Sequence, residues 1–137
     1  MSIVLSLAAF ALGEAIEHRV TLAHRGAEVA ATYRAHVAID TRTRGAHVPN
    51  RPSPQICRWT AAVTVERALD GAAGSARPVG SDHSLSGSHP GSCETARPAI
   101  EAEVARRTPA VRDHLIAAAE ADRATLLAEL DALRPNG

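Results

Sequence analysis

The segment between residues 81 and 93 concentrates the residue types that hydrolytic and metal chemistry require. Serine, histidine and an acid are the components of a nucleophilic triad, and histidine with cysteine can bind zinc. No GxSxG elbow, HExxH motif or CxxC motif accompanies them. A small hydrolase or a metal-dependent enzyme built on this segment is one hypothesis, and a flexible Ser/Gly-rich connection before a helix is the other. The residues concerned are Ser81, Asp82, His83, Ser84, Ser86, Ser88, His89, Ser92 and Cys93.

Four arginines, Arg42, Arg44, Arg51 and Arg58, lie in and around a proline-rich stretch at residues 45–54. The planar guanidinium group binds oxyanions through two parallel hydrogen bonds, which suits a phosphate, a lipid head group or an acidic peptide. The chain contains no lysine, so coding bias also explains the exclusive use of arginine. These four residues are the candidate anion-binding residues.

The absence of lysine excludes Schiff-base and pyridoxal-phosphate chemistry on the protein, and it excludes a P-loop. Fifteen acidic residues balance the fifteen arginines, and this neutrality argues against a dedicated nucleic-acid binder. The seven histidines lack the spacing that a metal site on one helix or strand requires. We therefore predict no cofactor, no metal ligands and no nucleic-acid partner.

Cys57 and Cys93 are the only cysteines, and their spacing does not match a metal site. In an exported protein they should form a disulfide, which the chain-entropy model values at roughly 3 to 4 kcal/mol for a loop of this length. The alternative is a pair of buried free thiols in a cytosolic protein.

An uncharged apolar run at residues 3–12 is too short to span a bilayer, which needs about twenty residues. It has the length of the hydrophobic region of a secretory signal, and Gly13 and Ala15 supply small residues at a cleavage point. No arginine precedes the run, so a buried helix or strand that opens the fold is the alternative. We expect residues 1–15 to be a signal peptide and residues 16–137 to form a single domain without a transmembrane segment.

The elements that must position these residues follow from the spacing of apolar side chains. Apolar and polar residues alternate at 19–23 and 29–40 on either side of Arg25-Gly26, which predicts a β-hairpin with Val20 opposite Ala31 or Tyr33. The prolines at 49–54 break this pattern, and a third alternating strand follows at 57–66. Residues 70–92 are rich in Gly, Ser and Ala, so we expect a loop with at most a short edge strand at 82–86.

From about residue 94 to residue 133 the apolar spacing becomes helical. Thr108 as a cap, followed by Pro109, predicts the start of a second helix there, and a kink is the alternative. The fold class is α+β, with an antiparallel meander of three or four strands packed against one or two C-terminal helices. Trp59 should lie in the core, although an exposed indole that binds a ligand is the competing interpretation.

These observations predict a small exported protein of the envelope or periplasm with a non-catalytic binding or scaffolding role. The expected partner is an envelope protein or an anionic ligand. A cytoplasmic location, with the enzyme on the segment at 81–93, is the alternative.

Overall fold

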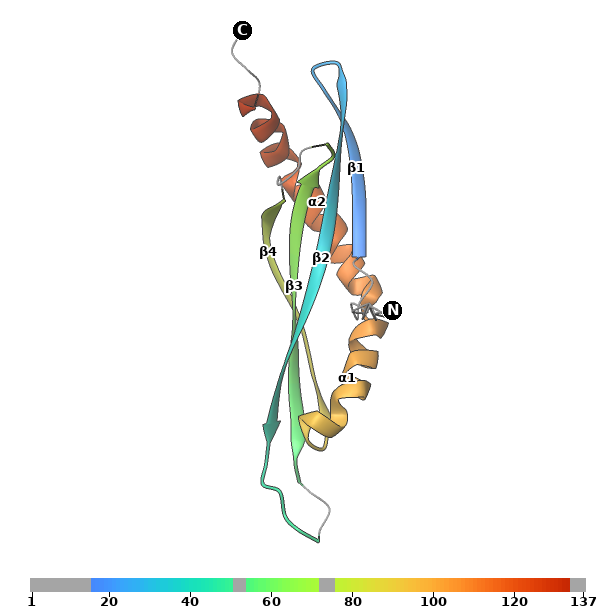
Figure 1. Cartoon of the computed structure of the whole chain (residues 1–137), viewed down its shortest axis with the longest axis vertical. Helices are drawn as coiled ribbons and strands as arrows, with labels where there is room; N and C mark the ends of the chain where they lie inside the picture. Colours follow the sequence, from blue (N-terminus) through green and yellow to red (C-terminus); the bar gives the residue numbers. More distant parts are fainter. Residues whose placement is uncertain (1–15, 51–53, 72–75, 134–137) are drawn as a thin grey trace, which may run out of the picture.

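The computed structural model describes residues 16–50, 54–71 and 76–133 (Figure 1). The expected signal peptide at 1–15 lies outside the described residues, and so does Arg51. Four strands are followed by two helices, which confirms the α+β class. The elements are β1 (Ile16–His24), β2 (Ala27–Arg44), β3 (Ile56–Leu69), β4 (Arg77–Pro90), α1 (Cys93–Arg106) and α2 (Thr108–Ala132).

The strands form one antiparallel sheet in chain order, β1-β2-β3-β4, so the predicted meander is confirmed. Arg25 and Gly26 both have positive φ, at 49° and 80°, as the two-residue turns that match strand twist require. The hairpin places Val20 opposite Ala31, one of the two registers that the alternation predicted.

The expectation of a loop across residues 70–92 is wrong, because residues 77–90 form β4, which pairs with β3 from Ile56 to Arg67. The short edge strand expected at 82–86 lies inside this longer strand. Serine and glycine have low strand propensity, but their backbone groups can pair with β3 as well as those of any residue. An irregularity in the ladder between Val63 and Val65 adds residues to β4 without exchanging its two faces.

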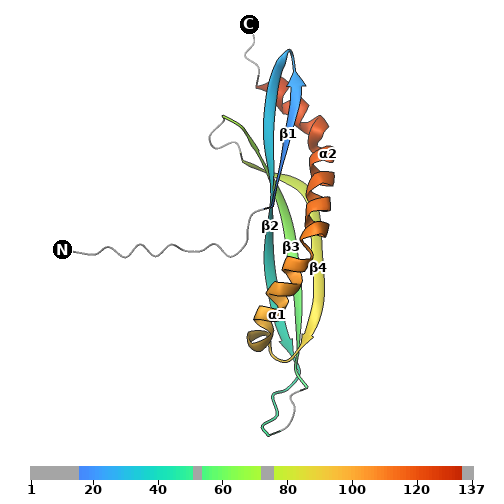
Figure 2. The ribbon, with the colours of Figure 1, turned by 90° about the vertical axis from the view of Figure 1, so that its right-hand side faces the viewer.

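The two helices follow one another along the same face of the sheet (Figures 1 and 2). The side chain of Ser92 caps α1 by accepting a hydrogen bond from the amide of Thr95. A second helix begins at Thr108, as predicted, with Pro109 in its first turn. Thr108 is not the cap, because the cap position belongs to Arg107 and the Thr108 hydroxyl instead donates to the carbonyl of Ala105 at 2.7 Å.

The core lies between the helices and the inward row of β3. Trp59 is only 3% exposed, so the interpretation of its indole as an exposed ligand platform is wrong. Its ring packs over Gly87 on β4, and the guanidinium carbon of Arg107 lies 5.4 Å from the ring centroid. The largest fully buried side chains belong to Tyr33, Ile100, Leu115, Leu126, Val63, Val111 and Cys57.

Cys57 and Cys93 form the predicted disulfide, with Cα atoms 4.7 Å apart. The bond joins the beginning of β3 to the first residue of α1, so it links the sheet layer to the helix layer. Among the described residues, neither helix combines the length and the apolar character needed to cross a membrane.

Candidate functional site

The face of the sheet that points away from the helices carries three of the four predicted arginines. Arg42 on β2 lies directly opposite Arg58 on β3, and Arg44 follows two residues after Arg42 on the same face. All three are exposed. The tertiary structure therefore brings Arg42, Arg44 and Arg58 together, and we call these three residues the arginine patch.

The arginine patch has no carboxylate partner in the described part of the chain, whereas many of the other arginines do. Like charges that stand directly opposite each other on neighbouring strands repel, so the pairing of Arg42 with Arg58 is unfavourable by itself. A bound anion would remove that repulsion. The arginines that do form ion pairs are Arg19, Arg25, Arg34, Arg67, Arg77, Arg106 and Arg107.

Hydroxyl groups border the arginine patch on the same face. Ser88 on β4 lies opposite Arg58, and the next outward row pairs Thr60 with Ser86. Hydroxyls and guanidinium groups together offer donors for the oxygens of an anion. Two cavities of the described structure lie on the helix side instead, with volumes of about 310 Å³ beside His24 and Leu130, and about 170 Å³ beside Trp59 and Glu103.

The serine and histidine residues at 83–89 are divided between the two faces of β4, and the side chains of Ser81 and Asp82 lie outside the described part of the chain. Ser84, Ser86 and Ser88 point outward, and His83 and His89 occupy the inward row. The ring of His83 stacks on that of His114 with centroids 4.6 Å apart, and Nδ1 of His89 lies 2.9 Å from the carbonyl oxygen of Pro90. The structure describes no cluster of three potential metal ligands among the residues it covers.

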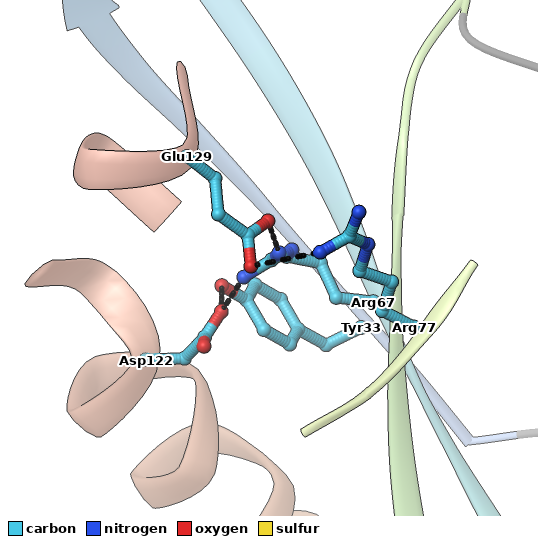
Figure 3. Close-up of polar contacts among 5 residues, drawn as sticks. All are labelled: Tyr33, Arg67, Arg77, Asp122 and Glu129. Atoms are coloured by element: carbon cyan, nitrogen blue, oxygen red, sulfur yellow. Dashed lines mark hydrogen bonds and ion pairs between the residues drawn. The ribbon is translucent and has the colours of Figure 1, made fainter. Parts of the chain in front are cut away.

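A buried polar cluster, which the sequence analysis did not predict, links α2 to the sheet (Figure 3). Arg67 is 3% exposed, and its guanidinium group donates to the carboxylates of Asp122 and Glu129. The hydroxyl of Tyr33 donates to Asp122 at 2.8 Å, and Arg77 lies 3.5 Å from Glu129. Buried charges that are paired in this way fix how α2 lies on the sheet, because any shift would leave a charge without its partner.

The cluster changes the proton affinity of two of its members. Burial and the hydrogen bond to the Asp122 carboxylate raise the pKa of Tyr33 well above that of a free phenol. Burial alone would lower the pKa of Arg67, but the hydrogen bond to Asp122 and its negative charge outweigh that effect and raise it. Both groups therefore stay protonated at physiological pH.

Two sequence signals mark this cluster in retrospect. Arg67 continues the inward row of Val63 and Val65, just beyond the residue where the predicted third strand ended. Asp122 lies between Ala118 and Leu126 on the buried stripe of α2. A charged residue in each apolar row is the pattern expected of a buried ion pair.

Comparisons with protein-family models, with curated proteins and with solved structures find no match for this chain. The fold and the site therefore define only a structural class. It is a disulfide-linked α+β protein with one sheet face covered by helices and the other face left uncovered by the described residues. The function must be inferred from the chain's own residues.

Proposed function

We propose that this chain is an exported, non-catalytic binding protein that holds an acidic segment of an envelope protein against its open sheet face. The arginine patch supplies the contacts. Export is supported by the disulfide, since such bonds persist in oxidising compartments, and by the apolar run at residues 3–12.

One observation carries the proposal: Arg42 and Arg58 stand opposite each other, exposed and without a described carboxylate partner. Arg67, by contrast, has both of its terminal nitrogens paired with carboxylates. Three neighbouring guanidinium groups without a described ion pair present a local positive field to a partner, although the net charge of the chain is zero.

The shape of the site favours an extended partner over a small molecule. Small-molecule sites are concave and bury most of the ligand, whereas the arginine patch lies on the open face of a sheet. The hydroxyls of Ser88, Ser86 and Thr60 extend the donor surface beyond the guanidinium groups. An acidic peptide in an extended conformation could contact both sets of donors.

The direct test uses a fluorescent peptide of alternating glutamate and serine, with binding followed by fluorescence anisotropy at low and at physiological salt. We expect the triple variant R42Q/R44Q/R58Q to bind at least about tenfold more weakly, because each charge-assisted hydrogen bond contributes roughly 1.5 to 3 kcal/mol. A glutamine-for-glutamate version of the peptide should not bind.

A matched control separates the arginine patch from net charge. Arg97, Arg112 and Arg123 are also exposed and have no described ion pair, but they lie on the helices. The variant R97Q/R112Q/R123Q changes the net charge by the same amount and should keep the affinity. Equal losses of affinity in both variants would show that net charge alone causes the effect. Unchanged affinity in R42Q/R44Q/R58Q would refute the proposal.

Export is tested separately by the intact mass of the chain after expression in a bacterial host. A mass that corresponds to a chain beginning at Ile16, recovered from the periplasmic or secreted fraction, is the expected result. A full-length chain that is confined to the cytosol would contradict it.

A further inference from the structure

Half of β2 lies at an edge of the sheet that no described strand covers. β2 has 18 residues and β1 has only 9, and β1 pairs with residues 27–35 alone. Residues 36–44 pair with β3 on one side, and no described strand lies on their other side (Figure 1). An unpaired strand edge is a template for the addition of another strand.

The direction of the backbone groups on this edge follows from one hydrogen bond. The amide of Asp70 donates to the carbonyl of Ala30 at 3.0 Å, so Ala30 directs its backbone groups toward β3. Along an antiparallel strand that direction alternates with each residue. Odd-numbered residues of β2 therefore point the other way, and Val37, Ile39, Thr41 and Thr43 present their amides and carbonyls at the open edge.

This edge lacks two of the features that normally prevent strand addition, namely proline and an irregular ladder. β4, at the opposite side of the sheet, has Pro78 and Pro90 near its ends and an irregularity in its ladder. Residues 36–44 contain no proline and pair with β3 without interruption. Ile39, on the helix-side row of the same segment, is 40% exposed, which is unusual for a large apolar side chain in that row.

We propose that a second copy of this chain pairs with residues 36–44 in antiparallel orientation, with the two-fold axis at Thr41. In this register Thr41 faces Thr41 of the second copy, and Ile39 faces Thr43 of the second copy. On the open face, Asp40 of each copy lies opposite Arg42 of the other. The dimer thus forms two ion pairs, and one sheet continues through both chains.

Charge complementarity selects this register. A shift of two residues in one direction sets Asp40 against Asp40, and a shift in the other direction sets Arg42 against Arg42, so both neighbouring registers are repulsive. Asp40 is exposed and has no ion pair within the described structure, although Arg42 lies two residues away. In the dimer each Arg42 pairs with a carboxylate, whereas Arg44 and Arg58 take no part in the ion pairs between the two chains.

Sedimentation velocity of the full chain, from about micromolar to millimolar concentration, tests the dimer. We expect a concentration-dependent monomer–dimer equilibrium, because an edge with these few hydrogen bonds gives a modest affinity. The variant D40R sets arginine against Arg42 and should raise the dissociation constant at least about tenfold. The charge-swapped variant D40R/R42D restores the opposite pairing and should recover the dimer.

Two further variants make the test specific. D113R carries the same charge change at an exposed position on α2 and should dimerise like the unmodified chain. The variant T41P removes a backbone amide at the open edge, so the variant should not dimerise. That amide takes no part in the ladder with β3, so circular dichroism should still show a folded chain.

A chain that stays monomeric throughout the concentration range would overturn the proposal. A dimer that D40R does not weaken, or that the charge swap does not restore, would place the interface elsewhere. Arg42 belongs to both the proposed dimer contact and the arginine patch, but the two proposals can be tested apart. D40R keeps the whole arginine patch, so it should still bind the acidic peptide as a monomer.

Discussion

The ring of Trp59 occupies the space where a side chain at position 87 would stand. A Cβ atom built on Gly87 would lie 2.6 Å from Cζ2 of the indole, well inside van der Waals contact. The glycine opposite Trp59 therefore permits a large aromatic side chain to be buried between β3, β4 and α1.

We predict that Gly87→Ala lowers the free energy of unfolding by about 1 to 3 kcal/mol, because the added methyl group must displace the ring. Chemical denaturation followed by circular dichroism measures the change. Gly80→Ala is the control, since a Cβ at Gly80 on the same strand meets no atom within 4 Å. Equal effects at the two positions would show that the Trp59 contact is not the cause.

Removal of the indole itself should cost more. Trp59→Ala leaves a cavity in a core whose only other aromatic residue with a described position is Tyr33, and we expect a loss of about 3 to 5 kcal/mol. Trp59→Phe should lose less, because part of the ring volume remains. An unfolding midpoint for Trp59→Ala that equals the unmodified value would mean that the ring contributes nothing to the core.

The pair formed by Arg67 and Asp122 predicts strong coupling between two substitutions. Asp122→Ala should destabilise the protein by about 3 to 5 kcal/mol, because Arg67 would remain buried with one fewer partner. The double variant R67M/D122L replaces both charges with apolar groups and should be markedly more stable than Asp122→Ala. Additive losses in the double-mutant cycle would contradict this coupling.

Tyr33 predicts a loss of stability at alkaline pH. Its pKa is raised in the folded state, so the fold favours the protonated phenol. Below the unfolded pKa of about 10 this contribution is fully present, and it decreases as the pH rises above that value because the unfolded chain releases the proton. The variant Tyr33→Phe lacks the ionisable group. Its free energy of unfolding should therefore decrease less than that of the unmodified protein between about pH 9 and about pH 11, a range that brackets the unfolded pKa.

Because Tyr33 is the only tyrosine, the phenolate absorbance measured during an alkaline pH titration reports on this residue alone. The folded chain should show no phenolate signal until it unfolds. Ionisation at the pH of a free phenol, in a chain that circular dichroism shows to be folded, would exclude the buried hydrogen bond to Asp122.

The disulfide predicts a further change in stability. The double variant C57S/C93S should lose roughly 3 to 4 kcal/mol relative to the oxidised protein, because the open chain gains conformational freedom when it unfolds. Reduction of the unmodified protein should give a similar loss. Mapping of non-reduced fragments should recover the two cysteines on linked peptides, and free thiols in the oxidised protein would contradict the bond.

The candidate site was partly predictable. Arg42, Arg44 and Arg58 were named from their position beside the proline-rich stretch, and the even spacing of Arg42 and Arg44 places them on one face of a strand. That Arg58 stands directly opposite Arg42 depends on the register of β2 with β3. A hairpin with a loop of about ten residues does not specify that register, so the structure was needed.

Local patterns in the chain determined the hairpin around Arg25-Gly26, the third strand and the helix start at Thr108, because each depends on residues that are neighbours in sequence. The sequence also determined which cysteines can pair, since Cys57 and Cys93 have only each other as partners, and the structure showed that they form the disulfide. Only the tertiary structure decided that residues 77–90 form β4 and that Arg67 meets Asp122 across 55 residues of chain. The first depends on the hydrogen bonds that β3 offers to a segment of low strand propensity, and the second on burial that brings distant charges together.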